Sequence, residues 1–141
     1  MKHAAAVIDT NVVVAGLLTA SADSPTARIL DAMRNGAFPF LLSTALLSEY
    51  REVLLRKKIR SLHGLTEREV DQLLTVIAAG AIVREPEART GAPDAKDNHL
   101  WSLLQTQPNS VLVTGDQALA KSPPPKSAVL SPREFVDQLA A

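Results

Sequence analysis

The chain alternates short apolar runs with longer segments of helical periodicity. The apolar runs predict buried strands at residues 4–8, 38–42, 81–83, 111–113 and 129–130. Between most of them, apolar residues recur every three or four positions, as on the inward face of an α-helix. Strands that alternate with helices favour a parallel sheet covered on both faces. We therefore predict an α/β fold, a three-layer α/β/α sandwich around a central, mostly parallel sheet of four to five strands.

Capping residues mark where several of the predicted helices begin. Serine or threonine before a helical segment accepts a backbone hydrogen bond, and a glutamate three residues later completes a capping box. The signals are Ser24 followed by Pro25, Ser43 or Thr44, Thr66 with Glu69, and Ser131 with Glu134.

Composition narrows the class of protein. A chain of 141 residues suits one domain, residues 1–141, and 46% hydrophobic residues are enough for a core. The 15 basic and 15 acidic residues cancel, which argues against a nonspecific nucleic-acid coat but not against one local RNA site. Cysteine is absent, so thiolate metal sites are excluded and a cytoplasmic location is expected. The apolar runs are shorter than the ~20 residues of a membrane span.

Acidic residues stand where the predicted strands end. Asp9 follows the first strand and Asp116 follows the fourth, so both should lie at the same edge of the sheet. Asp97 begins the helix before that fourth strand. Glu49 shares the inward face of its helix with Leu46 and Val53. We therefore expect these four carboxylates to converge.

Four carboxylates at one edge repel each other unless a cation lies between them. Oxygen ligands suit Mg²⁺ or Mn²⁺, and no cluster of Cys or His offers a zinc site. Two such ions about 4 Å apart can activate a water and stabilise the leaving oxygen of a phosphodiester.

Each acid also has a purely structural interpretation. Asp9 could cap a helix, and Asp97 could favour a helix N-terminus. Asp116 could be a turn residue after glycine. Glu49 could pair with Arg51 or Arg56 at the surface. The functional interpretation depends on the four acids together.

Four ordered motifs resemble those of the PIN-domain nucleases, and within them the VapC-like toxins of bacterial toxin–antitoxin pairs. The motifs are Val7-Ile8-Asp9-Thr10-Asn11-Val12, residues 43–50 with Glu49, Asp94-Ala95-Lys96-Asp97-Asn98-His99-Leu100, and residues 111–116 ending in Thr114-Gly115-Asp116. The ending at residues 130–135 is also similar to one branch of the family.

The resemblance implies a metal-dependent endoribonuclease that cleaves single-stranded or loop RNA with Mg²⁺ or Mn²⁺. It implies metal-ligand and catalytic roles for Asp9, Glu49, Asp97 and Asp116. It further implies that Asn11 and Thr114 support the ions, while Asp94 is either an outer acid or a turn residue. Two positions depart from the branch, because Ala95 replaces a common proline and Asn98 a common acid. An antitoxin protein and a homodimer are the partners that the resemblance implies.

Two rival functions stay open. An aspartate-dependent phosphatase would also place an acid like Asp9 after a strand, but one large class needs a second acid where this chain has Asn11. A catalytically silent PIN-like module that binds RNA or protein would not need the four acids.

One dense basic run and three histidines complete the candidate chemistry. The run consists of Arg51, Arg56, Lys57, Lys58 and Arg60, and either steers RNA phosphates or forms a solvated helix end. The histidines at positions 3, 63 and 99 show no ligand spacing, and we expect no role for them in the site.

Overall fold

Parallel strands form the centre of the fold in the computed structural model, which describes residues 1–140. Strands β1 (Ala5–Ile8), β4 (Ser110–Val113) and β5 (Ala128–Leu130) pair in the order β1-β4-β5, and β2 (Leu41–Leu42) pairs with β3 (Ile82–Val83). A single parallel bridge between Ala6 and Phe40 joins the two groups. The predicted parallel α/β architecture is confirmed, although the sheet is divided into three and two strands.

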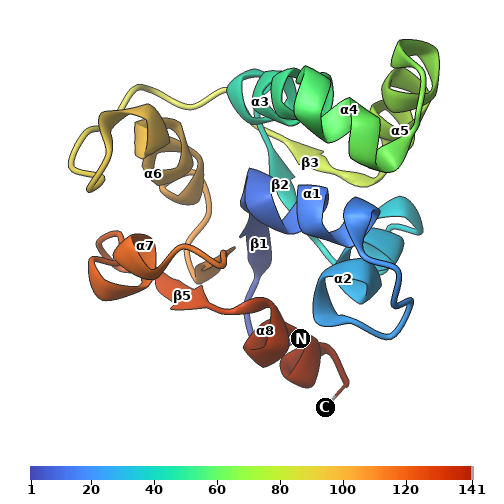
Figure 1. The fold of residues 1–141 in the computed structure, drawn as a ribbon. Coiled ribbons are helices and arrows are strands. Elements are labelled where there is room, and N and C mark those ends of the chain that lie inside the picture. Colours follow the sequence, from blue (N-terminus) through green and yellow to red (C-terminus); the bar gives the residue numbers. More distant parts are fainter. Residues whose placement is uncertain (141) are drawn as a thin grey trace.

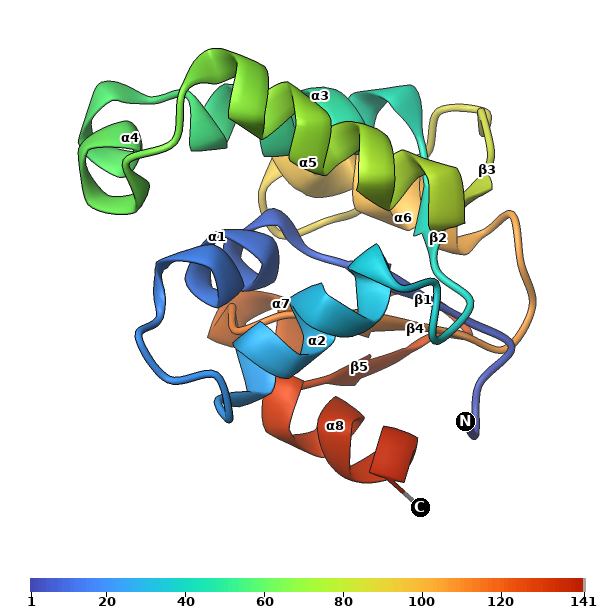
Figure 2. The same cartoon turned by 90° about the vertical axis from the view of Figure 1, so that its right-hand side faces the viewer.

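Helices cover the strands on both sides. Figures 1 and 2 place α1 (Thr10–Leu18) and α2 (Pro25–Arg34) on one side of β1 and α6 (Asn98–Leu104) on the other. Helices α3 (Thr44–Leu54) and α5 (Glu67–Gly80) pack together near β2 and β3. The remaining helical segments are α4 (Lys57–His63), a 3₁₀ turn at Ala95–Asp97, α7 (Gln117–Lys121) and α8 (Pro132–Ala140).

The register of the central strands brings their carboxyl ends together. Ile8 pairs with Val113, which pairs with Leu130. The backbone N–H of Asp9 donates to the Val113 carbonyl at 3.0 Å, and that of Thr114 donates to the Leu130 carbonyl at 3.0 Å. Asp9 and Thr114 therefore leave adjacent strands at the same level.

A continuous apolar core holds these strand ends in place. Every residue of β1 and β4 is buried. Tyr50 on α3 is one of the largest fully buried side chains, and its hydroxyl donates to the Ile8 carbonyl at 2.5 Å. This bond ties α3 directly to the end of β1, beside Asp9. It fixes the height of α3 relative to the strand that carries the first acid.

The predicted capping residues act as expected. Ser24 and Ser43 accept backbone hydrogen bonds at the starts of α2 and α3. The capping box of Thr66 with Glu69 is complete, and Ser131 and Glu134 exchange the same pair of bonds at the start of α8.

Three details differ from the sequence-based expectation. The second strand is shorter than residues 38–42, because Pro39 has no N–H to give to a ladder and only its carbonyl accepts, from Ala6 at 3.0 Å. The short helices α4 and α7 were not predicted.

Within residues 1–140, no helix is both long and apolar enough to span a membrane.

Candidate active site

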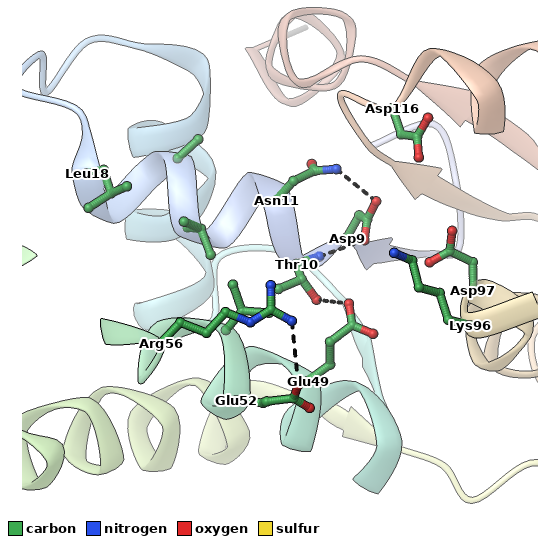
Figure 3. Close-up of a pocket in the computed structure, with 13 residues that line it drawn as sticks. Asp9, Thr10, Asn11, Leu18, Glu49, Glu52, Arg56, Lys96, Asp97 and Asp116 are labelled. Carbon is green, nitrogen blue, oxygen red and sulfur yellow. Dashed lines mark hydrogen bonds and ion pairs between the residues drawn. The ribbon is translucent and has the colours of Figure 1, made fainter. Parts of the chain in front are cut away.

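A pocket of about 620 Å³ opens at the carboxyl ends of β1 and β4 and contains all four predicted acids. Figure 3 shows Asp9 near its centre, with Glu49, Asp97 and Asp116 around it. The lining residues come from α1, α3 and the segments that precede α1, α4, α6 and α7: Asp9, Thr10, Asn11, Val14, Ala15, Leu18, Glu49, Glu52, Val53, Arg56, Lys96, Asp97 and Asp116.

Asp9 is the most deeply placed of the acids, with only 5% of its surface exposed. Its Oδ1 accepts from the Thr10 backbone N–H at 2.8 Å, which caps α1. Its Oδ2 accepts from the Thr114 hydroxyl at 2.7 Å and from Asn11 Nδ2 at 3.1 Å. Burial raises the pKa of the Asp9 carboxyl, the bonds from Thr114 and Thr10 lower it, and the charges of Glu49 and Asp116 raise it further. The net direction is upward.

Glu49 points into the pocket from α3 and is held at both oxygens. The Thr10 hydroxyl donates to Oε1 at 2.5 Å, and His99 Nε2 lies 2.7 Å from Oε2. The hydrogen bond from His99 is the main cause that lowers the pKa of the Glu49 carboxyl, and the Thr10 bond also lowers it against the effect of burial. Glu49 is therefore ionised at neutral pH.

Asp97 and Asp116 reach the pocket from the segments that begin α6 and α7. Burial raises the pKa of the Asp97 carboxyl, and the charges of Asp9, Glu49, Asp94 and Asp116 add to the rise. Asp116 Oδ1 accepts from the Ala118 backbone N–H at 2.8 Å and so caps α7. The charges of neighbouring acids therefore raise the pKa of both Asp9 and Asp97, which lie in the same pocket as Glu49 and Asp116.

Two of the predicted supporting residues contact the cluster and one does not. Asn11 and Thr114 both donate to Asp9, and the Thr114 hydroxyl also accepts from the Asp116 backbone N–H at 3.0 Å. Asp94 lies outside the pocket lining. It caps the 3₁₀ turn through the Lys96 backbone N–H at 3.1 Å and pairs with the Lys96 ammonium at 3.6 Å.

The structural interpretations of single acids hold only in part. Asp9 and Asp116 do cap helices, and both also line the pocket. Glu49 does not pair with an arginine. Arg51 instead binds Glu67 and Asp71 on α5 at 2.7 and 2.8 Å, and Arg56 approaches Glu52 at 3.5 Å.

The donor set fits a hard divalent cation in its chemistry. It consists of carboxylate oxygens, which Mg²⁺ and Mn²⁺ prefer, and two of these carboxyls have pKa values raised partly by their neighbours' charge. Among residues 1–140, however, no three acidic or histidine side chains already lie close enough together to hold one ion. Mg²⁺ usually retains several waters and takes one or two carboxylates plus substrate phosphates, so a wider spacing is compatible with it.

Comparison with known families agrees with this arrangement. The family profile described as PIN domain matches residues 5–118, which include all four acids. The chain belongs to the PIN-domain family. PIN domains are generally nucleases and typically use divalent metal ions. No curated protein matches the sequence.

Three residues in or beside this PIN-domain pocket were given no role by the sequence analysis: Thr10, Lys96 and His99. Thr10 and His99 hold Glu49, and His99 was wrongly set aside as incidental. Its position two residues after Asp97 was the available signal. Lys96 and Arg56 line the pocket as its basic residues. Lys96 had no local signal that separated it from other surface cations, whereas Arg56 belongs to the basic run that the sequence analysis named as a possible guide for RNA phosphates.

Proposed function

We propose that this PIN domain is a Mg²⁺- or Mn²⁺-dependent endoribonuclease whose ions are held by Asp9, Glu49, Asp97 and Asp116. The observation that carries the proposal is the meeting of four carboxylates from four separate segments in one pocket. Such a cluster is unfavourable by itself, because burial and neighbouring charge raise the pKa of Asp9 and Asp97. A divalent cation would remove that penalty.

The chain's own residues orient the carboxylates and partly exclude water from the pocket. Thr114, Asn11 and the Thr10 backbone orient both oxygens of Asp9, and Thr10 and His99 orient those of Glu49. The partly buried pocket lowers the local dielectric, which strengthens interactions with the phosphate. When bound, the ions would lower the pKa of an attacking water and neutralise charge on the phosphodiester.

The biological role follows from the motifs at residues 7–12, 43–50, 94–100 and 111–116, which resemble those of VapC-like toxins. We propose that the protein is the toxin of a toxin–antitoxin pair, that it acts on cytoplasmic RNA, and that an antitoxin protein and a second copy are its partners.

A catalytically silent binding module is the second candidate. The observation that favours it is that no three acidic or histidine side chains of residues 1–140 stand ready to hold one ion. The two candidates differ in whether metal leads to cleavage or only to stabilisation.

Cleavage of fluorescently labelled single-stranded and hairpin RNAs tests the proposal. We expect the pure protein to cut with Mg²⁺ or Mn²⁺ and to stop in EDTA, and Asp9→Asn and Asp116→Asn to abolish cutting. Asp137→Asn on α8, an exposed acid outside the pocket, is the matched control and should cut normally. Cleavage that persists in excess EDTA would refute the mechanism. Metal-induced stabilisation without cleavage of any RNA would favour the binding module.

A further inference from the structure

The pocket is far larger than an ion site requires. Its volume of about 620 Å³ lies in the range of pockets that bind small organic ligands. Its lining divides into an acidic end, described above, and an apolar arm. The apolar arm consists of Val14, Ala15 and Leu18 on α1 and Val53 on α3. In Figure 3, Leu18 lies at the end of α1 remote from Asp9, so the arm extends away from the acids along that helix.

Helix α1 presents apolar surface that the described chain does not cover. Its sequence from Thr10 to Leu18 contains no charged residue, yet only Thr10, Val12 and Val13 are buried. A helix that is apolar on all sides is normally covered on all sides. The arm is therefore a side of α1 where a ligand would complete the burial.

Arg56 supplies a cation beside the arm. It precedes α4 as its N-cap residue, and its side chain is 61% exposed. Its contact with Glu52 is long, at 3.5 Å, and Figure 3 shows the guanidinium turned into the pocket between Leu18 and Glu49. Arginine forms forked hydrogen bonds to phosphate and stacks on planar rings. Arg51 on α3 lies five residues earlier; its side chain pairs with acids of α5, and it is not part of the pocket.

We infer that the apolar arm is a nucleotide subsite: it takes the unstacked base of the nucleotide next to the scissile phosphate, and Arg56 binds the neighbouring phosphate of the same strand. This inference rests on the proposed ribonuclease function. An RNA strand is the fitting occupant because the arm is continuous with the acidic end of the pocket. The positive charge of Arg56 beside the arm also complements a phosphate of such a strand. A base can enter only from a single strand or loop, where it is not stacked in a duplex.

Binding of a short fluorescent single-stranded RNA in Ca²⁺, measured by anisotropy, tests the subsite apart from cleavage. Ala15→Leu fills the arm from an exposed position and should weaken binding about tenfold, by excluding one base. Ala79→Leu, at an exposed alanine on α5 outside the pocket, is the matched control and should bind as the wild type does.

Arg56→Gln tests the phosphate contact. It should also weaken binding about tenfold, and it should reduce the slope of log affinity against log salt by about 0.7, the value for one phosphate contact on a single strand. Lys58→Gln, in the same basic run but outside the pocket lining, should change neither quantity as much. An RNA series with one abasic position at a time should lose affinity at one position with the wild type, and Ala15→Leu should abolish that position dependence.

The outcomes separate the inference from the proposed function. If the wild type binds and cuts RNA while Ala15→Leu and Arg56→Gln bind like their controls, the subsite is wrong and the ribonuclease function stands. If Ala15→Leu changes only the oligomeric state and leaves RNA affinity intact, the arm is a protein interface and the inference is overturned. If the wild type neither binds nor cuts any RNA, both fail.

Discussion

Replacing Thr114 by valine isolates the hydrogen bond that most directly supports Asp9. Thr114 is 3% exposed, and its hydroxyl donates to Asp9 Oδ2 at 2.7 Å while it accepts from the Asp116 backbone N–H. Valine has nearly the same shape, so the change removes the hydroxyl and leaves the packing in place. We expect the fold to persist with lower stability.

The size of the loss follows from the charge on the acceptor. A hydrogen bond to a charged group stabilises a protein by about 1.5–3 kcal/mol. An unfolding entropy of about 2.1 cal/mol/K per residue gives roughly 0.3 kcal/mol/K for this chain. A loss of about 2 kcal/mol should therefore lower the melting temperature by roughly 7 °C.

The stability lost on replacing Thr114 by valine should depend on pH. The folded-state pKa of the Asp9 carboxyl is raised above its ordinary value of 3.8, mainly by burial. Its contribution to stability is therefore fully present below 3.8 and is lost as the pH rises through the folded pKa. The Thr114 bond holds that pKa down, so Thr114→Val raises it further. The variant should therefore lose more unfolding free energy, relative to the wild type, as the pH rises through the Asp9 pKa. This difference should shrink as the pH falls below that pKa.

Thermal melts in EDTA across a series from about pH 4 to about pH 8 measure this dependence. Thr106→Val is the matched control, because the Thr106 hydroxyl donates at 2.7 Å to the neutral Leu103 carbonyl. Its deficit should be smaller and constant over the series. A deficit for Thr114→Val that is the same at every pH would refute the idea that this hydroxyl supports an ionised carboxylate.

Three further predictions concern the other residues of the cluster. Asp97→Asn should raise the melting temperature of the metal-free protein at neutral pH. This rise in melting temperature should vanish as the pH falls below the raised pKa of Asp97, since only the ionised carboxyl is unfavourable in the folded protein. A rise that is the same at every pH would contradict this explanation. Mn²⁺ at 100 times its Kd should stabilise the protein by about 2.7 kcal/mol, and Asp116→Asn should reduce that shift in a thermal melt. His99→Gln should lower kcat about 10- to 100-fold with KM nearly unchanged, because it disorients Glu49, whereas His3→Gln should have no effect.

Local signals predicted much of the scaffold. The caps at Ser24, Thr66 and Ser131 involve residues three apart, and the buried runs in β1 and β4 form within single segments. The convergence of Asp9 and Asp116 followed from parallel strand order alone. Such features depend on short-range geometry that the sequence displays directly.

The missed contacts depend on how distant segments pack. His99 reaches Glu49 only because α6 approaches α3 across 50 positions of sequence. The residues of the basic run also lie in different places, which their spacing in the sequence did not predict. Arg51 faces α5, Arg56 lines the pocket, and Lys57 begins a separate helix.

The four acids fall into a fixed pair and a freer pair. Every side-chain oxygen of Asp9 and Glu49 takes part in at least one hydrogen bond, and Tyr50 ties the helix that carries Glu49 to the strand before Asp9. Within residues 1–140, the Asp97 carboxylate accepts no side-chain or backbone hydrogen bond, and Asp116 accepts one. A cation at Asp9 and Glu49 would therefore meet ligands whose rotamers are already fixed, while only Asp97 and Asp116 would still have to be ordered. This division reconciles a shared acidic pocket with the lack of three ligands already in place around one point.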